Sequence, residues 1–160
     1  MLIGIVSDTH DRVDPYAAAL QRLQALGAEY FIHCGDVGNE QILDLLAGFR
    51  ATFVWGNNDW DTQHLEGYAA SLELDCGGRF ASLELDGKKI AVIHGDDEKR
   101  KRALLAEQKY DYLMQGHTHV FEDVRSGKTR IINPGALYRA HPKSVALLNT
   151  KTDKLQRIIV

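Results

Sequence analysis

Seven side chains that are able to bind metal ions stand in five clusters along the chain, and each cluster directly follows a short apolar run. The clusters read "SDTH", "GD", "GNND", "HG" and "GHTH". Carboxylate, imidazole and amide groups all bind divalent cations, and no thiolate is obviously included, so the set indicates a mixed oxygen and nitrogen site. The seven residues are Asp8, His10, Asp36, Asn57, His94, His117 and His119.

Each of these residues also has an ordinary structural explanation when it is taken alone. An aspartate beside a glycine can be a plain turn residue, and a histidine at a strand end can be a hydrogen-bonded core residue. The joint pattern favours metal binding, because five apolar runs all end in residues that can be ligands. Seven ligands are too many for one tetrahedral ion but suit two ions that share a bridging carboxylate. His117 and His119 would then each serve a different ion.

The charge of such a centre would suit a phosphate ester. Two divalent cations against Asp8 and Asp36 leave a formal charge of about +2, which a bridging hydroxide reduces to about +1. The whole chain carries a net charge of -3, so a positive potential must be local, and nothing suggests a general nucleic-acid binder. The sequence therefore predicts a small phosphate ester as substrate.

The residues between the clusters predict the elements that hold them. The run 2–6 is continuously apolar, as a strand covered on both faces is, and 30–34 and 52–55 are interpreted as the second and third strands. After the first run we expect a helix that Asp14 caps, with Pro15 at its first position. Its apolar stripe and terminating glycine are Leu20, Leu23, Leu26 and Gly27. Ligands in open α/β sheets lie outside the carboxyl ends of the strands, so we expect the clusters to converge there.

The rest of the chain predicts one more capped helix and then a series of hairpins. Asn39 is expected to cap a helix that ends near Gly48, with Ile42, Leu45 and Leu46 turned inward. Asp86-Gly87 is a strong turn signal between two strands within 79–94. A loop with a short helix is expected over 60–75, a helix over 98–108, and strands over 112–115, 120–125, 129–132, 144–149 and 155–160. Together these elements predict a single α/β domain over 1–160, with two stacked mixed sheets and helices outside.

Composition and the start of the sequence indicate the cellular compartment that we expect. The start has no basic region before its apolar run, which excludes a signal peptide, and no stretch approaches the length of a membrane span. Cys34 and Cys76 form neither a disulfide framework nor a zinc pattern. A reducing, cytoplasmic location and no membrane partner are therefore expected.

The five clusters, in this order and spacing, resemble those of the calcineurin-like metallophosphoesterases, and the short length and "NPGA" at 133–136 resemble the small YfcE-type phosphodiesterase branch. The resemblance covers nearly the whole chain. It implies a four-layer αββα sandwich with a dinuclear centre and hydrolysis by a hydroxide that bridges two divalent metals. Manganese is the ion most often associated with such sites, with iron, zinc, cobalt or nickel as alternatives. By motif, one ion would be bound by Asp8, His10 and His119, the other by Asn57, His94 and His117, with Asp36 bridging them.

One position departs from the family pattern. Many family phosphatases have a histidine that helps to protonate the leaving group where this chain has Asn58, and an amide cannot act as a general acid near neutral pH. Losing such a group costs about 10²–10⁴-fold for a basic leaving group, which favours phosphodiesters over alkyl monoesters. Asn57 would stabilise developing charge, and Asp59 would either orient Asn58 or cap the next turn. His64 is a substitute donor or a surface residue, and Trp60 is a candidate pocket wall.

Several alternatives stay open at this point. The retromer subunit with this fold keeps much of the metal pocket but works by binding proteins, so a non-catalytic scaffold is the main alternative, and a phosphomonoesterase is the other. His33 is either a residue that supports the ligands or plain core. The sequence "NPG" at 133–135 is interpreted as a simple turn. A homo-oligomer whose neighbouring subunit covers the site is also compatible with so small a chain.

Overall fold

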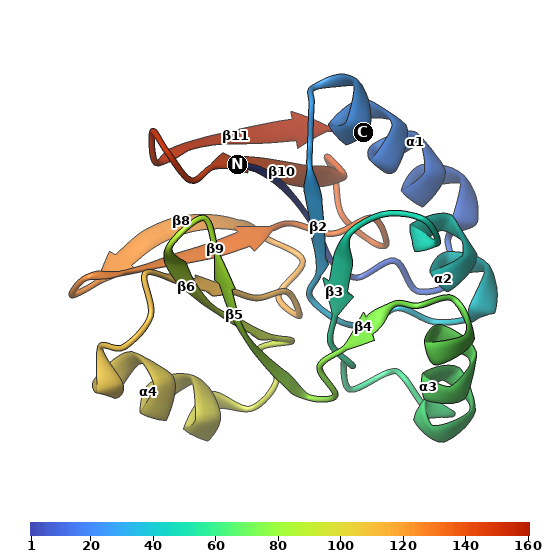
Figure 1. Cartoon of the computed structure of the whole chain (residues 1–160), viewed down its shortest axis with the longest axis horizontal. Helices are drawn as coiled ribbons and strands as arrows, with labels where there is room; N and C mark the ends of the chain where they lie inside the picture. Colours follow the sequence, from blue (N-terminus) through green and yellow to red (C-terminus); the bar gives the residue numbers. More distant parts are fainter.

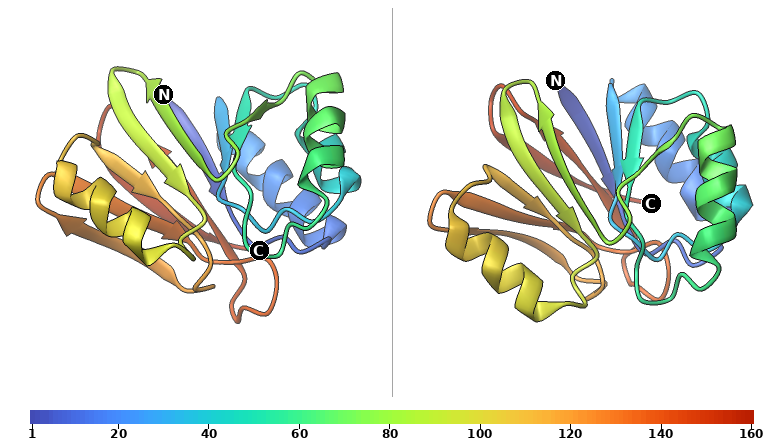
Figure 2. Two further views of the ribbon diagram at one scale, coloured as in Figure 1. Left: turned by 90° about the horizontal axis from the view of Figure 1, so that it is seen from below. Right: turned by 60° about the horizontal axis from the view of Figure 1, so that its bottom comes forward.

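Two β-sheets stacked face to face form the centre of the molecule, and helices cover both outer sides (Figure 1; Figure 2). The computed structural model describes all residues from 1 to 160. The first sheet contains β1 (Leu2–Val6), β2 (Tyr30–His33), β3 (Ala51–Phe53), β4 (Asp75–Cys76), β10 (Ser144–Asn149) and β11 (Lys154–Ile159). The second contains β5 (Phe80–Leu85), β6 (Lys88–Ile93), β7 (Tyr112–Met114), β8 (Phe121–Ser126) and β9 (Thr129–Pro134). The helices are α1 (Val13–Ala25), α2 (Glu40–Leu46), α3 (Thr62–Ser71) and α4 (Glu98–Glu107).

Both sheets are mixed, with parallel strands where the predicted ligands follow. The strand order is β11-β10-β1-β2-β3-β4 in the first sheet and β5-β6-β7-β9-β8 in the second. Strands β1, β2, β3 and β4 run parallel, as do β6, β7 and β9. The end of β1 is in register with the end of β2, because Val6 lies opposite His33. The carboxyl ends of neighbouring strands therefore meet at one edge of each sheet.

Three separate apolar clusters define four layers. Helices α1, α2 and α3 pack on the outer face of the first sheet through residues such as Tyr16, Ile42 and Leu65. The cluster between the two sheets contains Ile3 and Ile5 of β1 together with residues of β6, β7 and β9. Helix α4 covers the outer face of the second sheet through Leu104. The predicted αββα sandwich of mixed sheets is thus confirmed.

The edge of the sandwich opposite the ligand-bearing strand ends is closed by ion pairs between the two sheets. The N-terminal ammonium at the start of β1 lies 2.9 Å from Asp86 Oδ2 in the β5–β6 turn. Arg130 Nη1 of β9 lies 2.8 Å from Asp153 Oδ1 in the β10–β11 turn, and the Tyr112 hydroxyl donates to the same oxygen at 2.8 Å. Both contacts connect the two sheets directly.

Most of the predicted elements are confirmed, and a few details are wrong. Asn39 caps α2, because its side chain accepts from Ile42 N at 3.4 Å, and Asp86 and Gly87 both have positive φ, as a tight hairpin turn requires. Asp14 does not cap α1, which already begins at Val13, so its carboxylate lies within the first turn. Leu26 follows the last residue of α1 and is exposed, since the helix stops one residue earlier than its apolar stripe suggested.

The region 60–75 is more regular than predicted. It forms the ten-residue helix α3, and the chain then adds β4 to the edge of the first sheet. In α2 the fully buried residues are Ile42, Leu43 and Leu46, whereas Leu45 is only partly buried against the same cluster. No helix has both the length and the apolar character that crossing a bilayer would require.

Candidate metal centre

The loops that follow five strands meet at one edge of the sandwich and are joined there by backbone hydrogen bonds. Asp8 N donates to Gly35 O and His10 N donates to Asp36 O, each at 3.0 Å, which ties the loop after β1 to the loop after β2. In the second sheet, Gly116 N donates to His94 O at 2.8 Å. All seven predicted ligands lie on these loops or on the loop after β3.

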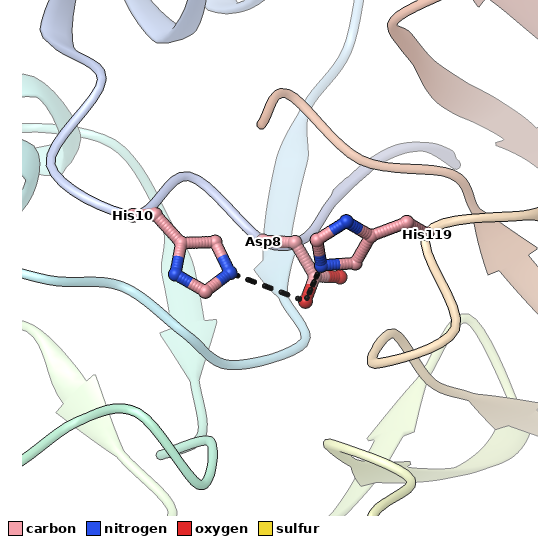
Figure 3. Close-up of side chains that lie close together, drawn as sticks. All are labelled: Asp8, His10 and His119. Atoms are coloured by element: carbon pink, nitrogen blue, oxygen red, sulfur yellow. Dashed lines mark ion pairs between the residues drawn. The ribbon is translucent and has the colours of Figure 1, made fainter. Parts of the chain in front are cut away.

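The first group consists of Asp8, His10 and His119. Figure 3 shows the two imidazoles on either side of the same Asp8 oxygen. His119 Nε2 lies 3.2 Å and His10 Nε2 lies 3.9 Å from Asp8 Oδ1. The other oxygen, Asp8 Oδ2, accepts from the backbone of His117 at 3.1 Å. One oxygen therefore fixes the carboxylate in place while the other faces both rings.

The second group consists of Asp8, Asp36 and His94, all three buried. Asp36 Oδ2 lies 3.3 Å from His94 Nε2 and also 3.3 Å from His10 Nε2. Asp36 is therefore placed between a histidine of one predicted set and a histidine of the other. A bridging carboxylate needs this position.

His117 and Asn57 stand at the exposed rim beside His94. The rings of His94 and His117 are 5.2 Å apart, and His117 Nδ1 lies 3.1 Å from Asn57 Oδ1. The structure thus gathers five of the predicted ligands into two groups whose ligand atoms lie within 4.8 Å of one another, and it places His117 and Asn57 directly alongside.

The donor set fits a divalent cation. Three buried ligand atoms that face one another have no hydrogen-bond partner: Asp8 Oδ1, His10 Nε2 and His94 Nε2. A buried polar atom without a partner costs about 1–3 kcal/mol, which a bound cation would offset. Carboxylate oxygen and imidazole nitrogen are also the donors that manganese, iron and zinc accept.

The hydrogen bond on the far side of His94 fixes which of its nitrogens can bind a metal. His94 Nδ1 lies 2.8 Å from the carbonyl oxygen of Cys34, which can only accept. Nδ1 therefore carries the proton, and Nε2 presents its lone pair toward Asp36. A backbone carbonyl behind a histidine is a common arrangement in metal sites.

The backbone of the site is in an unusual conformation. Five of the seven predicted ligands have positive φ, between 45° for His10 and 70° for His117. Non-glycine residues rarely adopt this region, and each such residue costs of order 1–3 kcal/mol. Residues held this way cluster at functional sites, because the surrounding structure must hold them there.

The electrostatics keep the central carboxylate ionised. Burial raises the pKa of Asp36, but the interaction with neighbouring His94 and the two hydrogen bonds from Asn58 outweigh burial and hold the pKa well below its usual range. Hydrogen bonding to Asp8 raises the pKa of His119 against the effect of burial, whereas burial lowers the pKa of His10.

Asn58 and Asp59 hold the loops in place. Asn58 donates twice to Asp36, from its backbone N to Oδ1 and from Nδ2 to Oδ2, each at 2.8 Å. Asp59 is buried and accepts from Gly56 N at 2.7 Å and from Gly38 N at 2.9 Å. Asp59 therefore joins the loop after β3 to the loop after β2 rather than orienting the Asn58 side chain.

Two further residues support the ligand loops. His33 is fully buried and accepts from Gly35 N at its Nδ1, so Nε2 carries the proton and donates to Thr9 Oγ1 at 3.0 Å, between two predicted ligands. Asn133 donates to Gly116 O at 2.8 Å and to Thr118 Oγ1 at 3.0 Å. The interpretation of "NPG" as a simple turn is thus incomplete, because its asparagine braces the loop that carries His117 and His119.

The remaining candidates lie around the rim. His64 is exposed and pairs with Glu40 at 2.6 Å. Trp60 is 86% exposed. It lies on a cavity of about 520 Å³ whose lining includes Asn58.

The sequence is similar to that of known phosphoesterases. Residues 1–153 match the model of the calcineurin-like phosphoesterase superfamily domain. Phosphodiesterase MJ0936 of Methanocaldococcus jannaschii is 29% identical over 167 residues, which cover 100% of this chain and 99% of that protein. Probable metallophosphoesterase MJ0623 of the same organism is 34% identical over 176 residues, which cover 100% of this chain and 81% of that one.

Solved structures share the architecture. The structure of an archaeal phosphodiesterase superposes with a TM-score of 0.89 at 27% identity, covering 100% of both chains. The YfcE phosphoesterase of E. coli gives a TM-score of 0.72 at 18% identity, with 100% of both chains covered. Vps29 of Entamoeba histolytica, in complex with zinc, gives 0.69 at 20% identity over 99% of both chains. The last two likenesses concern the fold alone.

Proposed function

The chain belongs to the calcineurin-like phosphoesterase superfamily, and from that premise we propose that it is a metal-dependent phosphodiesterase with a dinuclear centre at the edge described above. One observation carries the proposal. Unpartnered ligand atoms of Asp8, His10 and His94 converge on one place, and Asp36 stands between the two histidines. The similarity to a phosphodiesterase over the full length of both chains supports the same reaction class.

We assign the ligands to the two ions as follows. Asp8, His10 and His119 would hold one ion, Asn57, His94 and His117 would hold the other, and Asp36 would be shared by both. Two ions bound in this way would supply a hydroxide nucleophile and neutralise charge on the phosphoryl group. Manganese is the proposed metal, since it is the ion most often associated with such sites in this family and it accepts oxygen and nitrogen donors. The free cysteines Cys34 and Cys76 agree with a reducing compartment, which we propose to be the cytoplasm.

Two asparagines beside the ligands would orient the substrate and the shared carboxylate. Asn57, on the exposed rim, is placed to donate from its amide to a phosphoryl oxygen as negative charge develops there. Asn58 keeps Asp36 aligned through two hydrogen bonds, and its amide cannot act as a general acid. A leaving group must therefore depart without help from this position, which favours phosphodiesters with acidic leaving alcohols.

Hydrolysis of bis(4-nitrophenyl) phosphate, measured with each divalent metal in turn, tests the proposal. We expect turnover with manganese, two bound ions per chain by elemental analysis, and a decrease of at least about 10²-fold in Asp36→Asn and His94→Ala. His64→Gln is the matched control for metal content, because this histidine is paired with Glu40 outside the centre. A parent protein that is inactive with every divalent metal would favour the scaffold alternative, and faster turnover of alkyl monoesters would favour a phosphomonoesterase.

A further inference from the structure

A cavity of about 520 Å³ opens directly beside the proposed metal centre. It lies between the first turns of α2 and α3 and includes Asn58, which is hydrogen-bonded to Asp36. Asp11, the residue after the ligand His10, lies on it as well. The cavity therefore borders the centre on the side of His10 and Asp36, where one ester group of a bound phosphodiester would extend.

The lining of this cavity has a clear charge preference. Three of its ten residues are carboxylates, and none is a lysine or an arginine. Glu40 is paired with His64, but the carboxylates of Asp11 and Asp61 have neither a hydrogen bond nor an ion pair in the structure. An anionic ester group would be repelled by them, and a cationic group would be attracted.

One aromatic side chain adds a second kind of contact. Trp60 lines the cavity and is 86% exposed, although tryptophan is usually well covered. The neighbouring Trp55 is buried in the core, so the exposure of Trp60 is not general to this loop. The face of an indole is the strongest aromatic partner for an alkylammonium ion, and carboxylates nearby strengthen that preference.

We infer that this cavity binds the cationic ester group of a zwitterionic phosphodiester, an alkylammonium such as a choline or ethanolamine ester. The inference rests on the proposed function. The single negative charge of the phosphodiester would lie at the metal centre, and the ammonium group would lie against Trp60 between Asp11 and Asp61. The cavity would thereby select among phosphodiesters, whereas the metal centre would carry out the hydrolysis.

A pair of substrates that differ only in charge tests this inference. The probes are 4-nitrophenyl phosphocholine and the 4-nitrophenyl 3,3-dimethylbutyl diester, in which carbon replaces the quaternary nitrogen. We expect the parent enzyme to show a kcat/KM about tenfold higher for the choline ester. In the double variant Asp11→Asn/Asp61→Asn and in Trp60→Ala, this ratio is expected to fall to about 1, whereas Trp60→Phe keeps part of it. Glu107→Gln, which removes an exposed carboxylate far from the cavity, is the matched control and keeps the full ratio.

A binding measurement separates failure of the cavity from failure of the enzyme. Trp60 and Trp55 are the only tryptophans, so the indole signal of Trp60 can be followed by NMR during titration with tetramethylammonium. A saturable shift of that signal in the parent, weakened in the double variant, supports the inference whatever the activity. Equal turnover of both diesters with no shift overturns it, even though the phosphodiesterase proposal would stand. Turnover of neither diester with any metal would instead count against the phosphodiesterase proposal.

Discussion

Replacing Gly56 with alanine should displace Asp36, the proposed bridging carboxylate, without changing any proposed ligand. A Cβ at this position would lie 2.0 Å from Asp36 Oδ1 and 2.4 Å from the backbone nitrogen of Asp36. The carboxylate could rotate away, but the backbone atom cannot. Ordinary van der Waals contact begins near 3.4 Å, so the loop that carries Asp36 must move by about 1 Å. Gly56 does not have a positive φ, so the effect is purely steric.

The size of the effect follows from that displacement. Overpacking of this kind costs about 1–3 kcal/mol of stability, and disturbing the groups that orient a metal ligand typically weakens metal affinity by about 10–100-fold. A misplacement of about 1 Å can lower the turnover of a catalytic site by about 10²-fold. We therefore expect Gly56→Ala to bind manganese about 10–100-fold more weakly than the parent by isothermal titration calorimetry and to be nearly inactive.

Gly67→Ala is the matched control. Gly67 lies within helix α3, its added Cβ would meet nothing within 4 Å, and its φ is not positive. Alanine there should raise stability by about 0.5–1 kcal/mol and leave metal binding unchanged. If Gly56→Ala bound two manganese ions with the affinity of the parent, the steric reasoning about the Asp36 loop would be refuted.

Three further predictions concern the residues that hold the site in place and the binding of metal to it. Asp59→Asn replaces one acceptor of a buried pair of backbone N–H bonds by a donor, so urea unfolding should show a decrease in stability of about 1–3 kcal/mol, and an unchanged midpoint would contradict this role. Burial lowers the pKa of His33 to about 4, so the unfolded chain binds the proton first and stability falls as pH drops from about 6.5 to 4. Without metal, the free energy of unfolding of His33→Gln should therefore change less steeply with pH than that of the parent, by up to about 1.4 kcal/mol per pH unit. Identical pH dependence in the two proteins would argue against a lowered pKa of His33. Manganese at about 100 times its Kd should stabilise the parent against urea by about 2.7 kcal/mol per site, with chelator reversing the gain; no change in midpoint would exclude specific binding to the folded state.

The overall architecture could be predicted because its signals are local. β1 is a continuous apolar run, as a strand covered on both faces requires, β2 and β3 are mostly apolar, and each of the three is followed by a cluster of residues able to bind metal. Parallel pairing then brings those clusters to one edge. The hairpin at Asp86-Gly87 is equally local, because its two residues must both adopt positive φ.

The rest depended on interactions that sequence spacing does not show. Asn133 braces the loop of His117 and His119 across the sheet, and nothing in "NPG" distinguishes such a brace from a turn. The Asp59 carboxylate accepts hydrogen bonds from the backbone N–H groups of Gly38 and Gly56, and Gly38 is 21 residues away in the sequence. The end of α1 was misplaced by one residue, because Leu26 continues the apolar stripe although the chain has already left the helix.

The proposed centre also has a mechanical consequence, because its proposed ligands come from both halves of the sandwich. The first sheet contributes Asp8, His10, Asp36 and Asn57, and the second contributes His94, His117 and His119.

At the opposite edge, the N-terminal ammonium with Asp86 and Arg130 with Asp153 join the halves without any ion. The two halves are also linked at the metal edge itself, because His94 Nδ1 donates to the carbonyl oxygen of Cys34 and His117 N donates to Asp8 Oδ2. Bound ions would add direct links between ligands of the two sheets, so removing metal should increase amide hydrogen exchange at this edge more than at the opposite one.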